Sequence, residues 1–332
     1  MLHQLSRAAL SRLLTYQLHR SLNRMDLALP LSAKPADAPD LHPTDIMLHR
    51  RDGAIAIGLP PDASGLVFHA RKNITAYLYL FEHCPPEVQA MSGACQDGHE
   101  ASAARFAPSS RTPDTIALPD HYFILRRGFA AERDLAAAQA LPWAERRDTL
   151  VWRGGANGDG IHPQLPEDAT NPRVIQRARL CMLLADMPGT DAKLTAGQDR
   201  ARPLEVFAPL GLTGKPRPEA EWLGDKFAID IDGWTNAWSN LLIRLHYGCC
   251  VLKIDSADGY RQWWYDRLIP WEHYVPVRAD MTDLTEKLDW VRTNDAEAQA
   301  IAARGQQLAR TMTLASETAV GAELITQHWS AN

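Results

Sequence analysis

The sequence predicts an α/β protein whose C-terminal half contains a doubly wound parallel sheet. From residue 149 onward, apolar stretches of strand type alternate with amphipathic helical stretches, which is the order that produces parallel sheets. One strand is followed by the glycine-rich loop GGANGDG (154–160), and another ends in the acidic turn DIDG (230–233). Ligands of such sheets bind beyond the carboxyl ends of the strands. Both loops are therefore candidates for a functional site.

The N-terminal half begins with an amphipathic stretch, residues 1–25, in which arginines separate apolar side chains spaced along one helical face. Those apolar positions are Leu5, Ala9, Leu13 and Tyr16. Such a helix can pack against its own domain, or it can lie on an anionic membrane surface. The pattern permits both.

Three further segments of this half differ in composition. Residues 31–66 are rich in proline, aspartate and alanine and show few periodic apolar positions, so we expect loops there. The run NITAYLYLF (73–81) combines aromatic and β-branched residues, which favours a strand. A second short strand is expected at 88–95.

The elements of the C-terminal half follow in a regular order. A helix around 134–141 ends before a proline, and charged residues then lead into the first strand. The next helix opens with Asn171 as N-cap and Pro172 in its first position. The last helix opens at Asn294, with Glu297 completing a capping box. Strands are expected at 149–152, 227–231, 249–254 and 273–277, and further helices at 171–185, at 236–247 before Gly248, and around 260–268.

Composition argues against several function classes. The chain of 332 residues carries a net charge of −5, so it lacks the clustered positive charge that nucleic-acid binding requires. Its five cysteines form no CxxC pair, which argues against a zinc site or a disulfide framework and suits a reducing compartment. No stretch resembles a membrane span or a secretory signal. We expect a cytoplasmic protein, peripheral at most to the inner face of the cytoplasmic membrane.

The glycine-rich loop is the first chemical candidate. Bare backbone N–H groups, a helix dipole and the guanidinium groups of Arg153 and Arg173 all suit a phosphate. The loop has neither GK[ST] nor GxGxxG, which argues against nucleotide hydrolysis and dinucleotide binding. The alternative is an ordinary turn.

The acidic turn permits three interpretations. Asp230 and Asp232 can chelate a metal ion that bridges the diphosphate of a nucleotide sugar. An apolar strand ending in DxDG also resembles the nucleophile motif of haloacid-dehalogenase-type phosphatases, although Trp234 here replaces the usual Thr or Val. In the third interpretation Asp232 caps the helix that begins near Asn236, and Asp230 is solvated.

The stretch from about 149 to 312 resembles glycosyltransferase family 90. The resemblance rests on VWRGGANG, NPRVIQRARL, KFAIDIDGWTNAWSNLLIRLHYGCCVLKID and, most specifically, PWEHYVPV followed by DLTEKLDWVRTND. The family includes LpsA-type lipopolysaccharide transferases, capsule-associated xylosyltransferases and protein O-glucosyltransferases. Residues 1–148 match it only loosely.

The resemblance implies a GT-B architecture, with two Rossmann-like domains facing across a cleft. Residues 1–148 would recognise the acceptor and supply the base, residues 149–312 would bind the nucleotide sugar, and a C-terminal helix at 313–332 would pack back on the N-terminal domain. The family also implies inversion at the anomeric carbon without a metal ion. No cofactor is expected, because the UDP-sugar is the donor substrate.

Donor-binding roles carry over from the family motifs. Arg173, in the first turn of its helix, would contact the diphosphate, and the turn at Asp232 would bring the next helix N-terminus onto it. A second phosphate-binding arginine of the family aligns with Asn240, so the second charge must come from Arg153 or Arg244 or be missing. The donor-binding residues implied are Arg153, Gly154, Arg173, Asp232, Gly233, Ala237, Trp238, Ser239 and Asn240, with no metal ligand.

The catalytic base of the family is an aspartate that ends an N-terminal strand, and Asp97 holds that place. The alternative is a turn aspartate, because Asp-Gly is a common turn pair. His99 and Glu100 are neighbours that could substitute for Asp97.

The resemblance implies an inverting transfer of a sugar of the glucose, galactose or xylose class from UDP to a hydroxyl of a glycan acceptor. The acceptor expected is lipopolysaccharide or another surface glycan, with peripheral membrane contact through the N-terminal helix and no nucleic-acid partner. The alternatives are a Mg-dependent haloacid-dehalogenase-type phosphatase and a non-catalytic sugar-binding protein.

Overall fold

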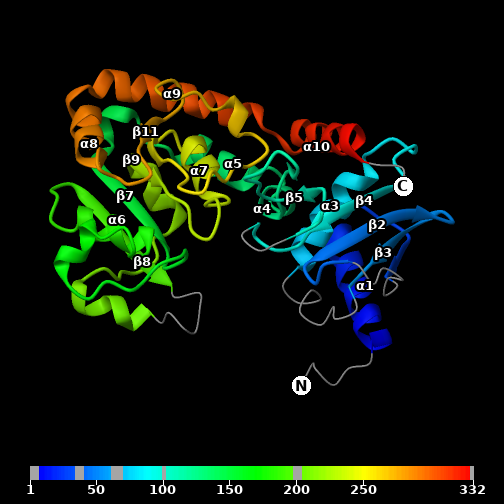
Figure 1. Cartoon of the computed structure of the whole chain (residues 1–332). Helices are drawn as coiled ribbons and strands as arrows, with labels where there is room; N and C mark the ends of the chain where they lie inside the picture. The colour runs from blue at the N-terminus through cyan, green and yellow to red at the C-terminus, as the bar shows by residue number, and fades with distance from the viewer. Residues whose placement is uncertain (1–6, 34–40, 61–69, 99–101, 197–203, 330–332) are drawn as a thin grey trace. The chain divides into compact units, whose positions relative to one another are not determined.

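A computed structural model describes residues 7–33, 41–60, 70–98, 102–196 and 204–329 (Figure 1). The chain forms two compact units, and the chain crosses from one to the other four times. The N-terminal unit contains the chain up to Gly128, then Arg261–Trp263, and finally the chain from Thr313 on, whereas the C-terminal unit contains Phe129–Tyr260 and Trp264–Met312. The first crossing thus falls before α5 (Ala130–Gln139) rather than at residue 148.

The C-terminal unit is built on a five-stranded parallel sheet, which confirms the α/β class. Its strands lie in the order β11-β10-β9-β7-β8, and every pair is parallel. All six residues of the central strand β9 are buried, as expected for a parallel sheet covered on both faces. The strands are β7 (Arg147–Gly155), β8 (Thr190–Ala196), β9 (Asp225–Asp230), β10 (Cys250–Ile254) and β11 (Val275–Val277).

Helices connect and cover these strands. Alternate strand residues such as Leu150, Phe227 and Leu252 share one hydrophobic core with apolar residues of α6, α8 and α9. The helix α7 packs against α9 and β10. The helices are α6 (Gln176–Leu184), α7 (Asn240–His246), α8 (Leu284–Thr293) and α9 (Asp295–Thr311).

The predicted start of α6 at Asn171 is wrong. A parallel bridge between Ile161 and Val174 holds this segment extended, so the helix begins only at Gln176. The Asn171 side chain instead accepts a hydrogen bond from the Arg173 N–H, within a turn. Arg173 therefore lies before the helix and not in its first turn.

Two other helix predictions need correction. The helix predicted around 260–268 is a single 3₁₀ turn, Tyr265–Arg267. The capping box at Asn294 does not form, because α8 ends immediately before this residue and the Asn294 amide donates to the Trp290 carbonyl at 2.9 Å. The C-terminal end of α7 is as predicted, since Gly248 adopts a φ of +68° just beyond it.

The N-terminal unit contains a six-stranded mixed sheet in the order β1-β3-β2-β4-β5-β6. Strand β2 is antiparallel to both β3 and β4, whereas the other pairs are parallel. The prediction of loops over 31–66 is wrong, because β1, β2 and β3 lie there. The Asp52-Gly53 turn between β2 and β3 has positive φ at both residues, as a two-residue hairpin turn requires. The strands are β1 (Leu31–Ala33), β2 (Asp45–Arg51), β3 (Ala54–Gly58), β4 (Ala90–Ala94), β5 (Phe106–Ala107) and β6 (Ile116–Ala117).

The run predicted as a strand at 73–81 is instead the helix α3 (Arg71–Glu82), and every residue from Asn73 to Phe81 is buried. A continuous apolar run carries no periodicity that distinguishes a buried helix from a buried strand. On one side of α3, Gly321 of α10 (Leu314–His328) packs so closely that a Cβ there would lie 2.8 Å from the Leu80 side chain. The helix α4 (His121–Leu125) also contacts α3.

The N-terminal helix α1 (Arg7–Asn23) packs within its own unit, beside α3 and β1 (Figure 1). Its buried face consists of Leu14, Leu18 and Leu22, each with no exposed surface. Of the predicted apolar face, Leu5 lies outside the described residues, and the prediction is wrong for Tyr16, which is 65% exposed. Among the described residues, no helix is long and apolar enough to cross a membrane.

Candidate functional site

The C-terminal sheet reverses its direction of growth between β7 and β9. After β7 the chain adds β8 on one side, and then adds β9, β10 and β11 on the other. At such a switch point the connections leave in opposite directions, which opens a crevice at the carboxyl ends of the two strands. The glycine loop after β7 and the DIDG turn after β9 meet at this place.

The glycine loop packs tightly against two other segments. Gly158 has a φ of +118°, and a Cβ there would lie 3.0 Å from the Gly233 carbonyl oxygen. Gly160 has a φ of +129°, and a Cβ would lie 2.6 Å from the Arg173 carbonyl oxygen. Both positions need glycine for conformation and for space. The loop thereby joins the acidic turn to the segment that precedes α6.

Arg177 connects the two loops. Its guanidinium donates to the carbonyl oxygens of Gly155 at 3.2 Å, Ile231 at 3.1 Å and Asp232 at 2.9 Å. Burial lowers the pKa of Arg177 to about 10, against the opposing effect of the nearby Asp232 and Asp230 carboxylates. The side chain therefore remains charged at neutral pH and places a cation at the switch point.

Asp230 is fully buried and its carboxylate faces protein groups. One oxygen accepts a hydrogen bond from the Asn240 amide at 3.0 Å, and the other lies 3.9 Å from the ammonium of Lys253. Lys253 is itself buried, 4.9 Å from the centre of the Tyr265 ring. The ammonium of Lys253 therefore places a positive charge beside the Asp230 carboxylate. The solvated Asp230 of the third interpretation is wrong.

Asp232 is only 7% exposed. Burial raises its pKa to about 6, while Lys253, the Ser256 hydroxyl and Arg177 act in the opposite direction. Among the described residues, no donor meets normal hydrogen-bond geometry at either carboxylate oxygen. Asp232 does not cap a helix, because α7 begins eight positions later, at Asn240.

The arginines expected to replace the missing phosphate contact are engaged elsewhere. The Arg153 guanidinium binds both carboxylate oxygens of Asp191, at 2.8 and 2.7 Å. The Arg244 guanidinium lies 3.5 Å from the centre of the Trp222 ring. Asn240, at the position of the family arginine, donates to the Ile229 carbonyl as well as to Asp230. A donor-binding role for these side chains stays a prediction.

The remaining predicted donor residues lie along the chain between the two loops and α7. Gly154 is the second-last residue of β7. A Cβ at this position would collide with the Trp152 ring. The predicted helix start near Asn236 is wrong, because Trp238 adopts a left-handed φ of +43° and Ser239 occupies the N-cap position without a side-chain cap. A left-handed tryptophan marks backbone strain beside the acidic turn.

Asp97 lies in the N-terminal unit, directly after β4, and is half-buried. Burial raises the pKa of the Tyr122 phenol, and the negative charges of Asp97 and Asp120 raise it further. The negative charge of Asp97 thus acts on Tyr122, which lies in the first turn of α4. His99 and Glu100, the alternative bases, lie outside the described residues.

Polar side chains fix the backbone around Asp97. The Asn73 amide donates to the Cys95 carbonyl at 3.0 Å, and its oxygen faces Nδ1 of His121. Because that oxygen can only accept, Nδ1 of His121 carries the proton. Burial, and then Lys72, lower the pKa of His121 to about 4, so the ring is neutral at pH 7.

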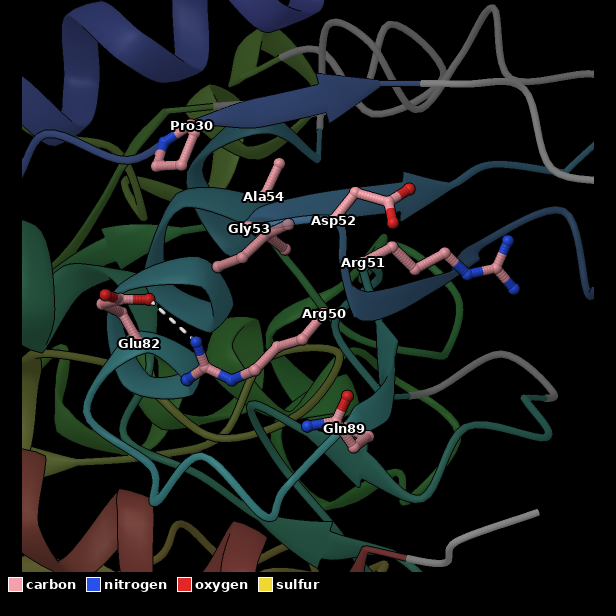
Figure 2. Close-up of a pocket in the computed structure, with 9 residues that line it drawn as sticks. Pro30, Arg50, Arg51, Asp52, Gly53, Ala54, Glu82 and Gln89 are labelled. Atoms are coloured by element: carbon pink, nitrogen blue, oxygen red, sulfur yellow. Dashed lines mark hydrogen bonds and ion pairs between the residues drawn. The ribbon is translucent and has the colours of Figure 1, made fainter.

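A separate pocket of about 350 Å³ lies at the turn between β2 and β3 (Figure 2). Its Arg50 side chain is paired with Glu82 at 3.2 Å, while Arg51 points away from that pair (Figure 2). Because β2 is antiparallel to β4, this turn is at the opposite end of the strand from Asp97. We therefore do not assign this pocket to the predicted site.

Sequence analysis missed Arg177 and Lys253. Arg177 lies four residues after Arg173 in NPRVIQRARL and is thus part of the same motif. The predicted helix start at Asn171 placed Arg173, and not Arg177, in the first helical turn. Lys253 lies in the strand CCVLKI, opposite Asp230 in the parallel register, and only the pairing of β9 with β10 reveals this. Among the described residues, no cluster of three or more His, Cys, Asp or Glu side chains is arranged to hold a metal ion.

Relatives among curated proteins match part of this chain. Uncharacterized protein 035R of Invertebrate iridescent virus 3 is 31% identical over 179 residues, which cover 51% of this chain and 15% of that protein. Protein O-glucosyltransferase 1 of Rattus norvegicus is 26% identical over 177 residues, covering 52% of this chain and 39% of that protein. Protein O-glucosyltransferase 2 of Danio rerio is 43% identical over 86 residues, covering 26% and 17%. The chain thus spans less than half the length of these relatives.

Solved structures show only distant likeness. Sucrose-phosphate synthase from Thermosynechococcus elongatus has a TM-score of 0.44 at 12% identity, covering 96% of this chain and 93% of that chain. Anabaena Alr3699/HepE in complex with UDP and glucose has a TM-score of 0.37 at 10% identity, covering 59% and 52%. Likenesses at this level decide nothing about the site.

The sequence profile described as glycosyl transferase family 90 matches residues 122–319. This match spans more than half of the chain and includes the glycine loop, Arg177, the acidic turn and Lys253. It therefore agrees with the resemblance found in the sequence motifs. The chain belongs to glycosyltransferase family 90.

Proposed function

We propose that the protein transfers a sugar from a UDP-sugar to a hydroxyl of a glycan acceptor, with inversion and without a metal ion. The observation that carries this proposal is the switch point of the C-terminal sheet, where a tightly packed glycine loop and the buried cations Arg177 and Lys253 come together. Backbone N–H groups and fixed cations suit the diphosphate of a nucleotide sugar.

The proposed reaction is a single displacement. The acceptor oxygen attacks C1 of the sugar while the bond between C1 and the diphosphate oxygen breaks, and that electron pair leaves with UDP. Asp97 takes the proton of the acceptor hydroxyl, a role that contributes about 10² to 10⁴ in rate. Cations near the diphosphate stabilise the negative charge that grows on it.

The position of Lys253 favours transfer without a metal ion. Its ammonium lies 3.9 Å from Asp230, and its charge also acts on Asp232. A divalent cation bound by these two carboxylates would be repelled by that ammonium. The DxD pair therefore fits a lysine better than Mn²⁺ or Mg²⁺.

Arg173 remains our proposal for a diphosphate contact, now from a turn instead of from a helix. Its side chain is exposed. Its backbone carbonyl accepts a hydrogen bond at 2.8 Å from the N–H of Ile161, the residue that follows the glycine loop. Arg177 stabilises the same loop from the buried side. In this proposal the exposed Arg173 contacts the ligand, whereas Arg177 fixes the loop that receives it.

For the acceptor we propose lipopolysaccharide or another surface glycan, and for the location the cytoplasm at the inner face of the membrane. The five cysteines are all free and buried, which suits a reducing compartment. The family match itself supports sugar transfer, and it weighs against the phosphatase alternative.

Thermal unfolding with nucleotides tests the donor proposal. UDP and UDP-sugars should raise the melting temperature more than GDP or ADP do, because a ligand stabilises by RT ln(1 + [L]/Kd). EDTA should leave that rise unchanged. A rise that disappears in EDTA and returns with Mn²⁺ would show that Asp230 and Asp232 bind a metal, and an absence of any rise would refute the donor class.

A further inference from the structure

The exposed face of α1 carries a row of arginines. Arg12, Tyr16 and Arg20 follow at intervals of four residues, and Arg24 continues the spacing just beyond the helix. Residues spaced in this way lie on one side of a helix. We call these four side chains the basic face. All four are exposed, Tyr16 to 65%.

This face is separate from the apolar face of the same helix. The apolar side chains Leu14, Leu18 and Leu22 are fully buried within the N-terminal unit, so they are not available to insert into a bilayer. The exposed side chains of α1 among the described residues are Arg12, Tyr16, Arg20 and Asn23, which combine positive charge with one aromatic ring. Exposed arginines of this kind are attracted to the negative surface potential of anionic lipids.

The charge of this region is opposite to that of the whole chain. Residues 1–25 contain four arginines and no Asp or Glu, whereas the chain has a net charge of −5. The next acidic residue, Asp26, is paired with Arg127 at 2.7 Å. Arg71, at the start of α3, adds another cation beside this helix by donating to the Gln17 side chain at 3.3 Å.

The basic face borders a hollow on the protein surface. A shallow hollow of about 470 Å³ is lined by Tyr16, His19, Arg20, Asn23 and Arg24. Arginine forms paired hydrogen bonds with phosphate oxygens, and tyrosine favours the boundary between water and lipid. The hollow therefore suits a phosphate headgroup next to an apolar surface.

We propose that the basic face binds the surface of a membrane that contains anionic phospholipids. Each arginine near such a surface contributes attraction that falls off within a Debye length. The occupant favoured is a membrane and not a nucleic acid, because the cations occupy one short helix and the rest of the chain is acidic.

Vesicle binding tests this proposal. The full chain is mixed with vesicles of phosphatidylcholine alone or with phosphatidylglycerol, and the bound fraction is measured by sedimentation. The variant Arg12→Gln/Arg20→Gln/Arg24→Gln should bind the anionic vesicles about a hundredfold more weakly than the unmodified chain. Binding of the unmodified chain should also weaken strongly as salt is raised.

A matched control removes the same charge elsewhere. The variant Arg51→Gln/Lys215→Gln/Arg310→Gln loses three exposed cations on other elements, and Arg51 is visible at the β2–β3 turn (Figure 2). Its binding should change by less than about fivefold, since only cations close to the surface contribute. Far-UV circular dichroism checks that both variants remain folded.

Three results would overturn the proposal. Equal losses in the two variants would show a simple effect of net charge. Equal binding to vesicles with and without phosphatidylglycerol would show that binding does not depend on the negative charge of the lipid headgroups. Binding to single-stranded DNA that needs the same three arginines, without binding to vesicles, would identify a nucleic acid as the partner.

Discussion

Each unit buries one aspartate whose pKa is raised to about 6, and the two are stabilised in different ways. Asp120 of the N-terminal unit accepts hydrogen bonds from the Phe123 N–H at 2.9 Å and from the Gln262 amide at 2.8 Å. Asp232 of the C-terminal unit has the cations Arg177 and Lys253 near it instead of such donors. Burial is the main cause of both shifts.

The difference separates a structural carboxylate from one in a candidate site. Asp120 caps α4 and ties it to Gln262, so its hydrogen-bonding capacity is used by the fold. Asp232 has buried oxygens without good donors among the described residues, a situation that is costly unless something else offsets it. Such groups concentrate at functional sites.

The largest expected effect concerns a third carboxylate, that of the half-buried Asp97. Asp97→Asn should lower kcat by about 10² to 10⁴, because an amide cannot accept the proton of the acceptor hydroxyl. UDP affinity should stay the same. Steady-state kinetics and UDP titration measure the two quantities, with the exposed Asp114→Asn as control. Nearly full activity in Asp97→Asn would move the base elsewhere, with Glu100→Gln as the next variant.

The cation beside Asp232 comes next. Arg177→Met leaves three backbone carbonyl oxygens without their donor and should lower the free energy of unfolding by about 3 to 5 kcal/mol. UDP affinity should fall as well, since the two loops lose their connection. Arg179→Met removes an arginine of the same helix that donates to a single carbonyl, and should cost less. Denaturant unfolding measures both, and equal losses would contradict the special role of Arg177.

The pH dependence of stability tests Asp232 itself. Its pKa is raised by folding, so the folded state holds this proton more tightly than the unfolded state does. The contribution is therefore fully present below the unfolded pKa near 4 and is lost as the pH rises through about 6. As the pH falls from 7 to 4, the unfolding free energy of the unmodified chain should gain up to about 3 kcal/mol relative to Asp232→Asn. A constant difference across this range would contradict the raised pKa.

The smallest effect concerns the donor to Asp120. Gln262→Leu removes a hydrogen bond to a buried carboxylate and should lower the unfolding free energy by about 1.5 to 3 kcal/mol. Transfer kinetics at a temperature well below unfolding should remain unchanged. A loss of kcat without a loss of stability would mean that Asp120 belongs to the chemistry, and the distinction between the two aspartates would fail.

Four of the five strands of the C-terminal sheet could be predicted from sequence, because they are apolar and separated by recognisable turns, whereas β8 (Thr190–Ala196) was not predicted. The strand CCVLKI and the end of α7 at Gly248 fall where the pattern puts them. The N-terminal unit resisted prediction for two reasons. The helix α3 is buried from Asn73 to Phe81, so no exposed polar face reveals its period, and β1 to β3 lie in a segment whose composition is typical of loops.

The candidate site was predicted in part. The two loops were found because glycine and Asp-Gly signals are local, and the family motifs cover the same stretch. Arg177 and Lys253 were missed because their importance depends on long-range pairing between β7, β9 and β10. The start of α6 was misplaced because Asn171 and Pro172 imitate a helix start, whereas the bridge from Ile161 to Val174 keeps the chain extended.

The repeated crossing of the chain between the units determines the order in which they can be completed during synthesis. The N-terminal unit needs Gln262 for Asp120, and it needs α10, where Glu317 accepts a hydrogen bond from Trp263 at 2.7 Å. On the ribosome, the first unit to emerge is therefore the last whose contacts can all form. Until α10 leaves the exit tunnel, α3 lacks the helix that covers its Leu80 side, so this apolar surface stays uncovered for most of the synthesis of the chain.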